Sequence, residues 1–264
     1  MALISQLRHL LSPRPRAAAA AAAAPEFRAP LAPDRPFVAV GDIHGRADLL
    51  EALLARIRDQ AGARVPLVFL GDYIDRGEGS AAVLAHLQAL QRGGWGAEVV
   101  CLSGNHEAMM LDFLDAPETG GPLWLHNGGA QTLASFGVYP PGRAPDALRA
   151  ARDDLRTALP PGTEAWLRAL PLHWRSGNVF AAHAGADPNT PLDQQDAAHL
   201  LWGHPEFERT PRTDGIWVAH GHTIRDTATA HEGRIGLDTG AYATNRLSAA
   251  LIAEGECRFL TTGA

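Results

Sequence analysis

Short apolar runs, polar loops that carry glycine, and helical patterns alternate along the chain from Phe37 onward. The run 37–40 leads into the polar sequence 41–45, and apolar residues then recur at helical spacing between Leu49 and Ile57. Because this alternation repeats, we expect an α/β fold with βαβ crossovers. The further runs predicted to be strands are 67–70, 99–102, 179–182, 216–219 and 234–237.

The remaining segments complete one domain. Residues 112–175 are predicted to be mostly helical or looping, and 247–252 is predicted to pair with 257–260 as an antiparallel hairpin. No segment repeats at a fixed period. We therefore expect a single domain over residues 37–264.

Residues 1–36 differ from the rest of the chain in composition. Eight consecutive alanines occupy 17–24, and a proline-rich stretch follows over 25–36. We expect a disordered Ala/Pro-rich N-terminal extension that does not belong to the fold. The arginines ahead of the alanines faintly resemble a signal peptide, but alanine is only weakly apolar and the leucines precede these arginines. We therefore predict a cytoplasmic protein.

Composition removes several classes of protein. All 23 basic residues are arginine, which excludes lysine Schiff-base chemistry and the phosphate-binding lysine of P-loop enzymes. The net charge of −6 disfavours a general nucleic-acid-binding surface. Two cysteines cannot build a disulfide framework or a four-thiolate zinc site, and no run reaches about 18 strongly apolar residues. We therefore expect neither nucleic acid nor a membrane as a partner.

Potential metal ligands follow five of the predicted strands at their carboxyl ends, where ligands bind in open α/β sheets. One such loop could be a tight turn with a capping aspartate, and a lone histidine after a strand is more often structural. Five polar clusters at the tips of apolar strands would repel one another, however, unless a positive charge such as a divalent metal lay between them. The candidate ligands are Asp42, His44, Asp72, Asn105, His183 and His222.

The mixture of donor atoms narrows the choice of metal. Carboxylate, amide oxygen and imidazole without thiolate suit manganese, iron or zinc. Six donor residues are too many for one tetrahedral zinc, but they suit two ions that share a bridging carboxylate. Two such ions can clamp the oxygens of a phosphoryl group.

Five short motifs in the chain resemble those of a known family. They are Gly-Asp-Ile-His-Gly (41–45), Gly-Asp-Tyr-Ile-Asp-Arg-Gly (71–77), Gly-Asn-His-Glu (104–107), His-Ala-Gly (183–185) and Gly-His-Thr (221–223). In this order they resemble the calcineurin-like metallophosphoesterases, and among these the bacterial PPP-type serine/threonine protein phosphatases. The resemblance implies an α/β fold of four layers, a β-sandwich flanked by helices, with a dinuclear metal site at the carboxyl ends of the strands. Residues 37–264 would then be the metallophosphoesterase catalytic domain.

The resemblance also implies two metal sites that share one ligand. The first ion would be held by Asp42, His44 and Asp72. The second would be held by Asp72, Asn105, His183 and His222. Manganese is the favoured ion, with iron or zinc as alternatives. Asp238 is expected to fix a loop near one of the metal-binding histidines.

The same resemblance implies the catalytic groups. Arg76 would bind the substrate phosphate through its planar guanidinium, with Asn105 as a further substrate-binding residue. His106 would be the general acid that protonates the leaving alkoxide, and Asp75 would orient it. A hydroxide that bridges the metals would attack phosphorus directly. The intact set of these residues argues against a catalytically dead binding module.

The motifs indicate phosphoester hydrolysis but leave two classes of substrate. Phosphoserine or phosphothreonine on proteins is the first choice, because Glu107 ends the motif 104–107 where symmetrical dinucleoside-tetraphosphate hydrolases usually have aspartate. The alternative is a symmetrical diadenosine tetraphosphate hydrolase or a small-nucleotide phosphodiesterase. Phosphoproteins are therefore the expected partners, and the sequence does not predict an oligomeric state. Glu107 is also expected to cap the helix that follows it.

Some positions stay open at this stage. His220 precedes His222 by two residues and would point the same way in a strand; we choose His222 as the ligand because it lies in the Gly-His-Thr motif. A second phosphate-binding arginine could be Arg209, Arg212 or neither. The polar–aromatic segment 124–129 could shape the substrate groove or pack a helix terminus.

Overall fold

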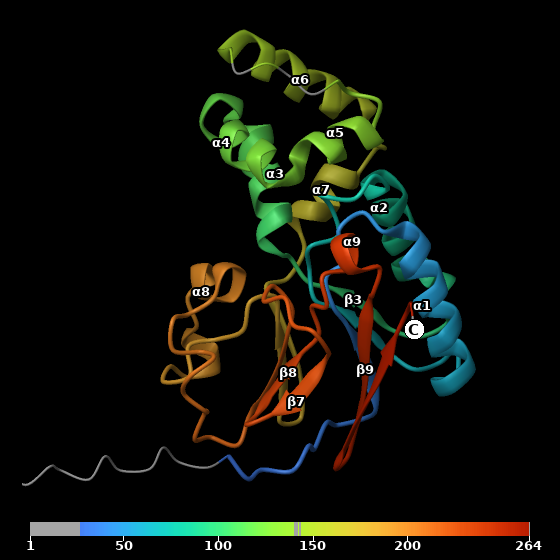
Figure 1. Ribbon diagram of the computed structural model, residues 1–264, viewed down its shortest axis with the longest axis vertical. Helices are drawn as coiled ribbons and strands as arrows, with labels where there is room; N and C mark the ends of the chain where they lie inside the picture. Colours follow the sequence, from blue (N-terminus) through green and yellow to red (C-terminus); the bar gives the residue numbers. More distant parts are fainter. Residues whose placement is uncertain (1–26, 140–141, 143, 264) are drawn as a thin grey trace, which may run out of the picture.

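Two five-stranded mixed sheets pack face to face in the computed structural model, which describes residues 27–139, 142 and 144–263 (Figure 1). The first sheet contains β1 (Phe37–Val40), β2 (Leu67–Phe69), β3 (Val99–Cys101), β9 (Ser248–Ala253) and β10 (Glu256–Thr261). The second contains β4 (His173–Ser176), β5 (Val179–Ala182), β6 (Trp217–His220), β7 (Thr229–His231) and β8 (Arg234–Gly236). The strand orders are β10-β9-β1-β2-β3 and β4-β5-β6-β8-β7.

The strands that precede the candidate ligands run parallel to their neighbours. β1 pairs with β2 and β2 with β3 in the first sheet, and β5 pairs with β6 and β6 with β8 in the second. The antiparallel pairs join β9 to β1 and β10, β4 to β5, and β7 to β8. Because parallel strands end at the same edge of a sheet, the loops after β1, β2 and β3 open side by side.

Helices cover the sandwich on both outer sides (Figure 1). α1 (Ala47–Ala61) and α2 (Ser80–Ala89) lie against the first sheet, and α8 (Ala197–Trp202) lies beside the second. The short α9 (Ala241–Thr244) precedes β9. A helical lobe stands at one end of the sandwich and contains α3 (Asn105–Asp115), α4 (Pro117–Trp124), α5 (Ala130–Ser135), α6 (Pro145–Ala158) and α7 (Thr163–Arg168).

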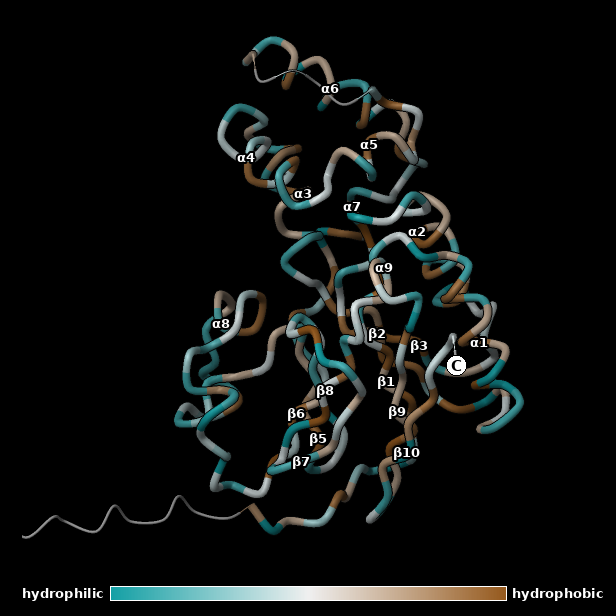
Figure 2. Tube along the Cα trace, in the orientation of Figure 1, coloured by the Kyte–Doolittle hydropathy of each residue, from teal (hydrophilic) through white to brown (hydrophobic). Residues whose placement is uncertain are grey.

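Strand alternation explains why the central strands read as continuous apolar runs. In β1, Val38 and Val40 face the helices of the first sheet, whereas Phe37 and Ala39 face the second sheet. All four side chains are fully buried, and the hydrophobic colour of the central strands is visible in Figure 2. A strand buried on both faces needs apolar residues at every position. Each large side chain buried in this way stabilises the fold by about 1.5–3 kcal/mol.

The expected α/β sandwich flanked by helices is confirmed. Strands 37–40 and 179–182 have the predicted bounds, and the apolar positions between Leu49 and Ile57 form the buried face of α1. The strand predicted over 216–219 begins one residue later, as β6. β4 and β7 were not predicted, because their exposed positions interrupt any apolar run.

Residues 27–36 pack against both sheets. The Leu31 side chain is buried, and its carbonyl oxygen accepts a hydrogen bond from the Gly255 amide in the β9–β10 turn (2.8 Å). The Phe27 ring meets the Trp217 ring of β6 edge-on, with centroids 5.1 Å apart. The part of the predicted extension that the structure describes therefore contributes to the fold, whereas residues 1–26 lie outside the described residues. We propose that the catalytic domain begins at or before Phe27 rather than at residue 37.

Within the described part of the chain, no helix is long and apolar enough to cross a membrane.

The Asn178 side chain ties residues 27–36 to the β4–β5 turn, which predicts a stability effect. Its Oδ1 accepts from the Ala32 amide (2.7 Å), and its Nδ2 donates to the Pro30 and Gly215 carbonyls (2.8 and 3.2 Å). Asn178→Ala should lower the free energy of unfolding by about 1–3 kcal/mol, measured by urea denaturation. The exposed Asn189→Ala serves as the control and should change it by less than about 0.5 kcal/mol. Equal effects of the two changes would show that residues 27–36 are not anchored here.

Candidate metal centre

The loops after β1, β2 and β6 are joined directly to one another. The amides of Ile43 and His44 both donate to the Asp72 carbonyl (3.0 and 2.9 Å). The His222 amide donates to Asp42 Oδ2 across the two sheets (3.0 Å). The polar edges of the two sheets therefore meet at one place, and the predicted ligands lie there.

Asp72 lies between two groups of imidazoles. Its Oδ2 is 3.5 Å from His44 Nε2 and 3.8 Å from His106 Nε2. Its Oδ1 is 3.3 Å from His183 Nε2. Donor atoms of Asp72, His183 and His222, all predicted ligands of the second ion, lie within 4.8 Å of one another. Donor atoms of His44 and Asp72 form a similar group, but its third member is His106 rather than the predicted ligand Asp42. Asp72 is common to both, as a bridging ligand must be.

Asn105 completes the second group. Its Oδ1 is 2.9 Å from His183 Nε2 and 3.1 Å from His222 Nδ1. Asn105 is the first residue of α3, directly after the loop that leaves β3. A carboxylate, an amide oxygen and two imidazoles therefore converge within hydrogen-bond or near-contact distance.

The tautomers of two histidines fit metal binding. His44 Nδ1 is 2.9 Å from the Ile74 carbonyl, and His183 Nδ1 is 3.0 Å from the Leu70 carbonyl. A carbonyl can only accept, so in both rings Nδ1 carries the proton and Nε2 keeps its lone pair. The His183 lone pair faces the oxygens of Asp72 and Asn105, and the His44 lone pair faces Asp72 and the Arg76 guanidinium. Electron-pair donors that face one another are stabilised by a divalent cation between them. The residues present therefore fit a metal centre.

Asp42 supports the same conclusion. Its side chain is 2% exposed, and its Oδ1 has no hydrogen-bond partner among the described residues. Burial raises the pKa of Asp42 well above its usual value, and the neighbouring Asp238 and Asp72 raise it further. The Asp238 carboxyl fixes its own loop by accepting from the Gly240 amide (2.8 Å). Asp238 thus has the loop-fixing contact that was expected of it, and it lies near Asp42.

Asp72 is ionised near pH 7 although it is buried. Burial opposes its ionisation, but His183, His106 and His44 hold the Asp72 pKa well below the usual value. Burial in turn lowers the pKa of His44 to about 3 and that of His183 to about 4. Both imidazoles are therefore neutral near pH 7, which is the form that binds a metal.

Two glycines of the sequence motifs allow the carboxylates to approach the backbone. A Cβ at Gly104 would lie 2.2 Å from Asp72 Oδ1, and a Cβ at Gly221 would lie 1.9 Å from Asp42 Oδ1. Any larger residue would push these carboxylates out of position. The glycines before Asn105 and His222 are therefore part of the site geometry.

His106 and Asp75 form a buried acid–base pair. His106 Nδ1 is 2.6 Å from Asp75 Oδ2, and both side chains are almost fully buried. Burial would lower the pKa of His106, but Asp72 and Asp75 more than compensate and raise it. Trp124 Nε1 donates to both Asp75 oxygens (3.1 and 3.0 Å), and Thr132 Oγ1 donates to Asp75 Oδ1 (2.6 Å). Asp75 is thus held from the helical lobe while it orients His106.

Glu107 fastens two loops together. Its Oε2 accepts from the amides of Asp72 and Gly104 (2.8 and 2.9 Å), and its Oε1 accepts from the Tyr73 amide (2.8 Å). The expected cap of α3 is present in the Gly104 bond. Beyond that cap, Glu107 fixes the backbone that carries Asp72, and burial raises the pKa of its carboxyl to about 7.

Arg76 lies at the mouth of the site. Its Nη1 is 3.3 Å from His44 Nε2, and its guanidinium carbon lies 4.8 Å from the centroid of the Tyr242 ring. The Tyr242 ring also meets the His44 ring edge-on, with centroids 5.4 Å apart. A cleft of about 510 Å³ adjoins Arg76 and Tyr242 and is also lined by 45–48 and 77–79. An arginine stacked on an aromatic ring beside an open cleft is suited to bind an anionic group.

Site residues adopt left-handed backbone conformations that side chains other than glycine rarely adopt. Seven non-glycine residues among those described have positive φ, and five of them belong to the predicted site. Such strain is concentrated at functional sites in proteins. The five are His44, Asp72, Asp75, Arg76 and His222.

Several open positions of the sequence are now placed. His222 belongs to the group around Asp72, whereas His220 is buried against the Phe207 ring with centroids 4.9 Å apart. The Arg212 guanidinium bonds Asp214 and the carbonyls of 187 and 190, so it serves the local loop structure. Arg209 is exposed.

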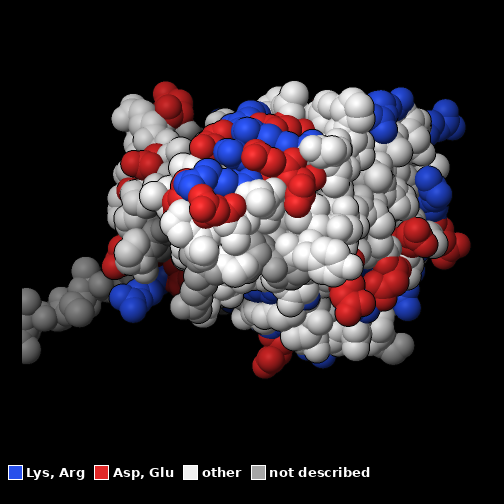
Figure 3. All heavy atoms as spheres, turned by 90° about the horizontal axis from the view of Figure 1, so that it is seen from above, with Lys and Arg blue, Asp and Glu red and all other residues white. Residues whose placement is uncertain are grey.

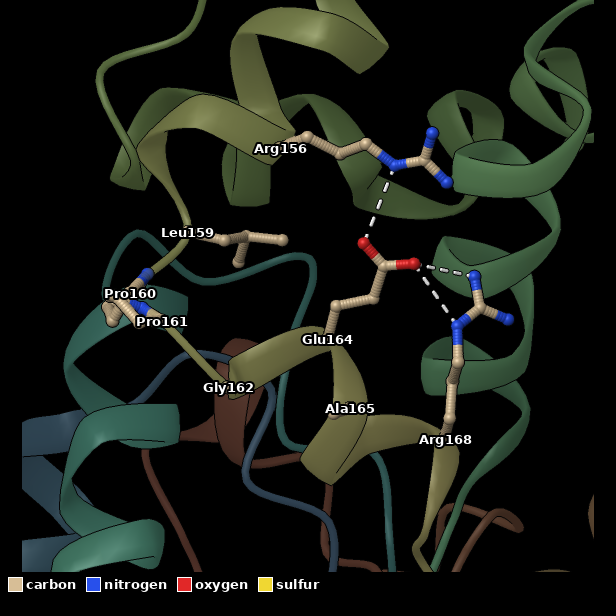
Figure 4. A pocket seen from close by; sticks show the side chains of 8 residues that line it. All are labelled: Arg156, Leu159, Pro160, Pro161, Gly162, Glu164, Ala165 and Arg168. Atoms are coloured by element: carbon tan, nitrogen blue, oxygen red, sulfur yellow. Dashed lines mark hydrogen bonds and ion pairs between the residues drawn. The ribbon is translucent and has the colours of Figure 1, made fainter.

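The helical lobe carries a cavity that is separate from the candidate metal centre. It measures about 420 Å³ and lies between the end of α6 and α7, where Arg156, Glu164 and Arg168 point toward one another (Figure 4). The lobe seen from its free end shows arginines and carboxylates interleaved, with Arg149 paired to Glu118 (Figure 3). Arg156 and Arg168 also pair with Asp115, so two arginines face two carboxylates at the cavity. The arginines of both features are therefore paired with carboxylates.

Sequence reasoning missed two residues that shape the site, Thr132 and Tyr242, and the role of a third, Trp124. Thr132 and Trp124 fix Asp75, and Tyr242 stacks on Arg76. Of the two expectations for segment 124–129, the packing of a helix terminus is confirmed, because a Cβ at Gly129, directly before α5, would lie 2.5 Å from the buried Trp124 ring. The bond from Trp124 to the Asp75 carboxylate was not expected. No spacing rule connects a tryptophan to an aspartate 49 positions earlier. Only the folded arrangement reveals the contact.

Comparison with known proteins places the chain in a family. The model of the calcineurin-like phosphoesterase family matches residues 35–226, so the chain belongs to that family. It is therefore a metallophosphoesterase, a class of hydrolases. Members of this family typically use two divalent metals, which agrees with the two groups of donors around Asp72.

Relatives with two different activities are similar to the chain. It is 29% identical to serine/threonine-protein phosphatase 2 of Salmonella typhimurium over 218 residues, which cover 79% of this chain and 89% of the relative. It is 26% identical to the symmetrical bis(5'-nucleosyl)-tetraphosphatase of Ralstonia nicotianae, covering 80% and 87%. The crystal structure of a provisionally named diadenosine tetraphosphatase shares the fold, with a TM-score of 0.60, 23% identity and coverage of 89% and 100%.

The bond from Trp124 to Asp75 predicts a change in His106 titration. Trp124→Phe removes the bonds that hold the Asp75 carboxylate in place, so the Asp75–His106 contact should weaken and the His106 pKa should fall, by up to about one unit. The His106 imidazole can be titrated by NMR in the metal-free protein. Trp95→Phe is the matched control, since Trp95 is buried and its Nε1 donates to the Val65 carbonyl. An unchanged His106 pKa in Trp124→Phe would contradict the positioning role.

Proposed function

We propose that this metallophosphoesterase hydrolyses phosphate monoesters, with phosphoserine or phosphothreonine on proteins as substrate. The observation that carries the proposal is the buried His106–Asp75 pair, 2.6 Å apart, with His106 Nε2 turned toward Asp72. A proton donor fixed beside the candidate metal ligands is suited to a substrate whose leaving group must be protonated.

Leaving-group chemistry favours an alkyl ester. The alkoxide of serine or threonine is strongly basic and leaves poorly without a proton, whereas a nucleotide phosphate is a far weaker base. The raised pKa of His106 keeps its proton available near neutral pH. The 29% identity to a serine/threonine-protein phosphatase supports the same choice.

The donor groups around Asp72 have a direct place in this proposal. Two divalent ions would supply a nucleophile and neutralise phosphate charge when bound, and manganese is the favoured metal. Arg76 binds the substrate phosphate from the side of the cleft. Asn105 binds both the substrate and one of the metal ions. The residues that would hold the ions are Asp42, His44, Asp72, Asn105, His183 and His222.

A symmetrical dinucleoside-tetraphosphate hydrolase is the second candidate. Relatives with that name match most of the chain at 26% identity. The Tyr242 ring is 36% exposed beside Arg76, and such a ring can stack a nucleobase.

We further propose that the protein acts in the cytoplasm on phosphoprotein partners.

Removal of the proton donor should separate substrates by leaving group. His106→Ala should lower kcat on a phosphothreonine peptide by about 10²–10⁴-fold, because the alkoxide then leaves unprotonated. p-Nitrophenyl phosphate has a good leaving group and should lose far less. The exposed His231→Ala is the control and should leave both rates unchanged. Equal losses on both substrates in His106→Ala would rule out the general-acid role.

A direct comparison of substrates tests the protein-phosphatase assignment. With manganese present, kcat/KM should be higher for a phosphothreonine peptide than for diadenosine tetraphosphate. Higher kcat/KM for the dinucleotide would overturn the substrate but leave the metal centre in place. Asp72→Asn should abolish turnover of either substrate, which confirms that the measured activity comes from this site.

A further inference from the structure

A third group of metal-binding side chains lies apart from the centre around Asp72. Asp187, His199 and His204 each offer a donor atom, and these atoms all lie within 4.8 Å of one another. All three side chains are half-buried. The proposed reaction assigns no role to any of them.

The end of α8 brings the two histidines together. His199 lies in the last turn of α8, and Gly203 follows the helix with a φ of +89°. Glycine adopts this backbone conformation without strain, and the turn brings His204 back toward the helix. The two imidazole rings meet edge-on, with centroids 4.6 Å apart and an angle of 78° between their planes.

The carboxylate of Asp187 is held in a fixed orientation. Thr190 Oγ1 donates to its Oδ2 (2.6 Å), and the Asn189 amide donates to its Oδ1 (2.9 Å). The Gln195 side chain bonds both the amide and the carbonyl of Asp187 (2.7 and 3.0 Å). Hydrogen bonds that orient a carboxylate in this way are typical of metal ligands, although they also stabilise turns.

The Asp187 carboxylate and the His204 ring are close to each other but are not hydrogen-bonded. His204 Nδ1 is 4.0 Å from Asp187 Oδ1, which is too far for a hydrogen bond. The Glu206 amide donates to His204 Nδ1 at 3.2 Å, and an ion bound at Nδ1 would replace this long bond. Ligands of a tetrahedral zinc ion lie about 3.3 Å apart, given bonds of about 2.0–2.1 Å. The donor atoms lie up to 4.8 Å apart, so the half-buried side chains would need to approach one another by up to about 1.5 Å.

We propose that Asp187, His199 and His204 bind a transition-metal ion of the zinc class, separately from the dinuclear centre. Two imidazoles and one carboxylate, with water in the fourth position, are a donor set that suits Zn²⁺. The ion would cross-link α8 to the loop that follows β5. Because the Ala184 amide donates to the Leu200 carbonyl of α8 (2.8 Å), this cross-link would also brace the backbone next to His183.

Zinc stoichiometry of the full chain tests the proposal. The metal-free protein is titrated with Zn²⁺ by calorimetry, and bound zinc is counted after buffer exchange. His199→Ala/His204→Ala should bind one equivalent fewer than the wild type. His86→Ala/His231→Ala, which removes two histidines from other elements, should bind as much as the wild type. Equal stoichiometry in the wild type and in His199→Ala/His204→Ala would overturn the proposal.

Two further variants separate this site from the dinuclear centre and from folding effects. Asp72→Asn should lose zinc at the dinuclear centre yet keep the equivalent that depends on His199 and His204. The milder His199→Gln should show the same loss if the double variant unfolds. In thermal unfolding, Zn²⁺ should raise Tm more for Asp72→Asn than for Asp72→Asn combined with His199→Gln. Equal shifts would show that no ion binds outside the dinuclear centre.

Discussion

The joint burial of carboxylates and imidazoles around Asp72 is the constraint on which the rest of the structure depends. Four carboxylates near the ends of apolar strands are each at most 2% exposed, namely Asp42, Asp72, Asp75 and Asp238. Buried charges that lack compensation cost several kcal/mol each. Metal ions between the two groups of donors would supply this compensation. The neutral histidines with lone pairs toward Asp72 show that the chain is arranged to accept them.

The fold maintains this arrangement by holding strained loops at the ends of rigid strands. Left-handed backbone at Asp72, Asp75 and Arg76 aims three side chains of one loop in three directions. Glu107 and Thr132, from the helical lobe, bond the backbone of that loop at Tyr73 and Asp75. The lobe therefore fixes the His106–Asp75 pair, while the sheets fix the candidate metal ligands. In the proposed reaction, each part of the fold would control one requirement of phosphoester hydrolysis.

The sequence predicted the central strands and their polar ends because both faces of those strands are buried, so their apolar runs have clear limits. It did not predict β4 and β7, whose exposed residues leave no such run. It also placed residues 27–36 outside the fold, because a proline-rich composition does not reveal the backbone bonds that Asn178 makes to them. The ligand residues could be selected from local motifs. The partners of Asp75 and Arg76 could not, since Trp124 and Tyr242 reach them only through tertiary structure.

The most direct test of the central claim is a crystal structure of the manganese-loaded protein with anomalous diffraction data at the manganese edge. Two anomalous peaks are expected, one on each side of the Asp72 carboxylate. The first should lie beside His44, and the second beside Asn105 and His183. A single peak, or two peaks that do not share Asp72, would contradict the bridging role on which the proposed chemistry rests.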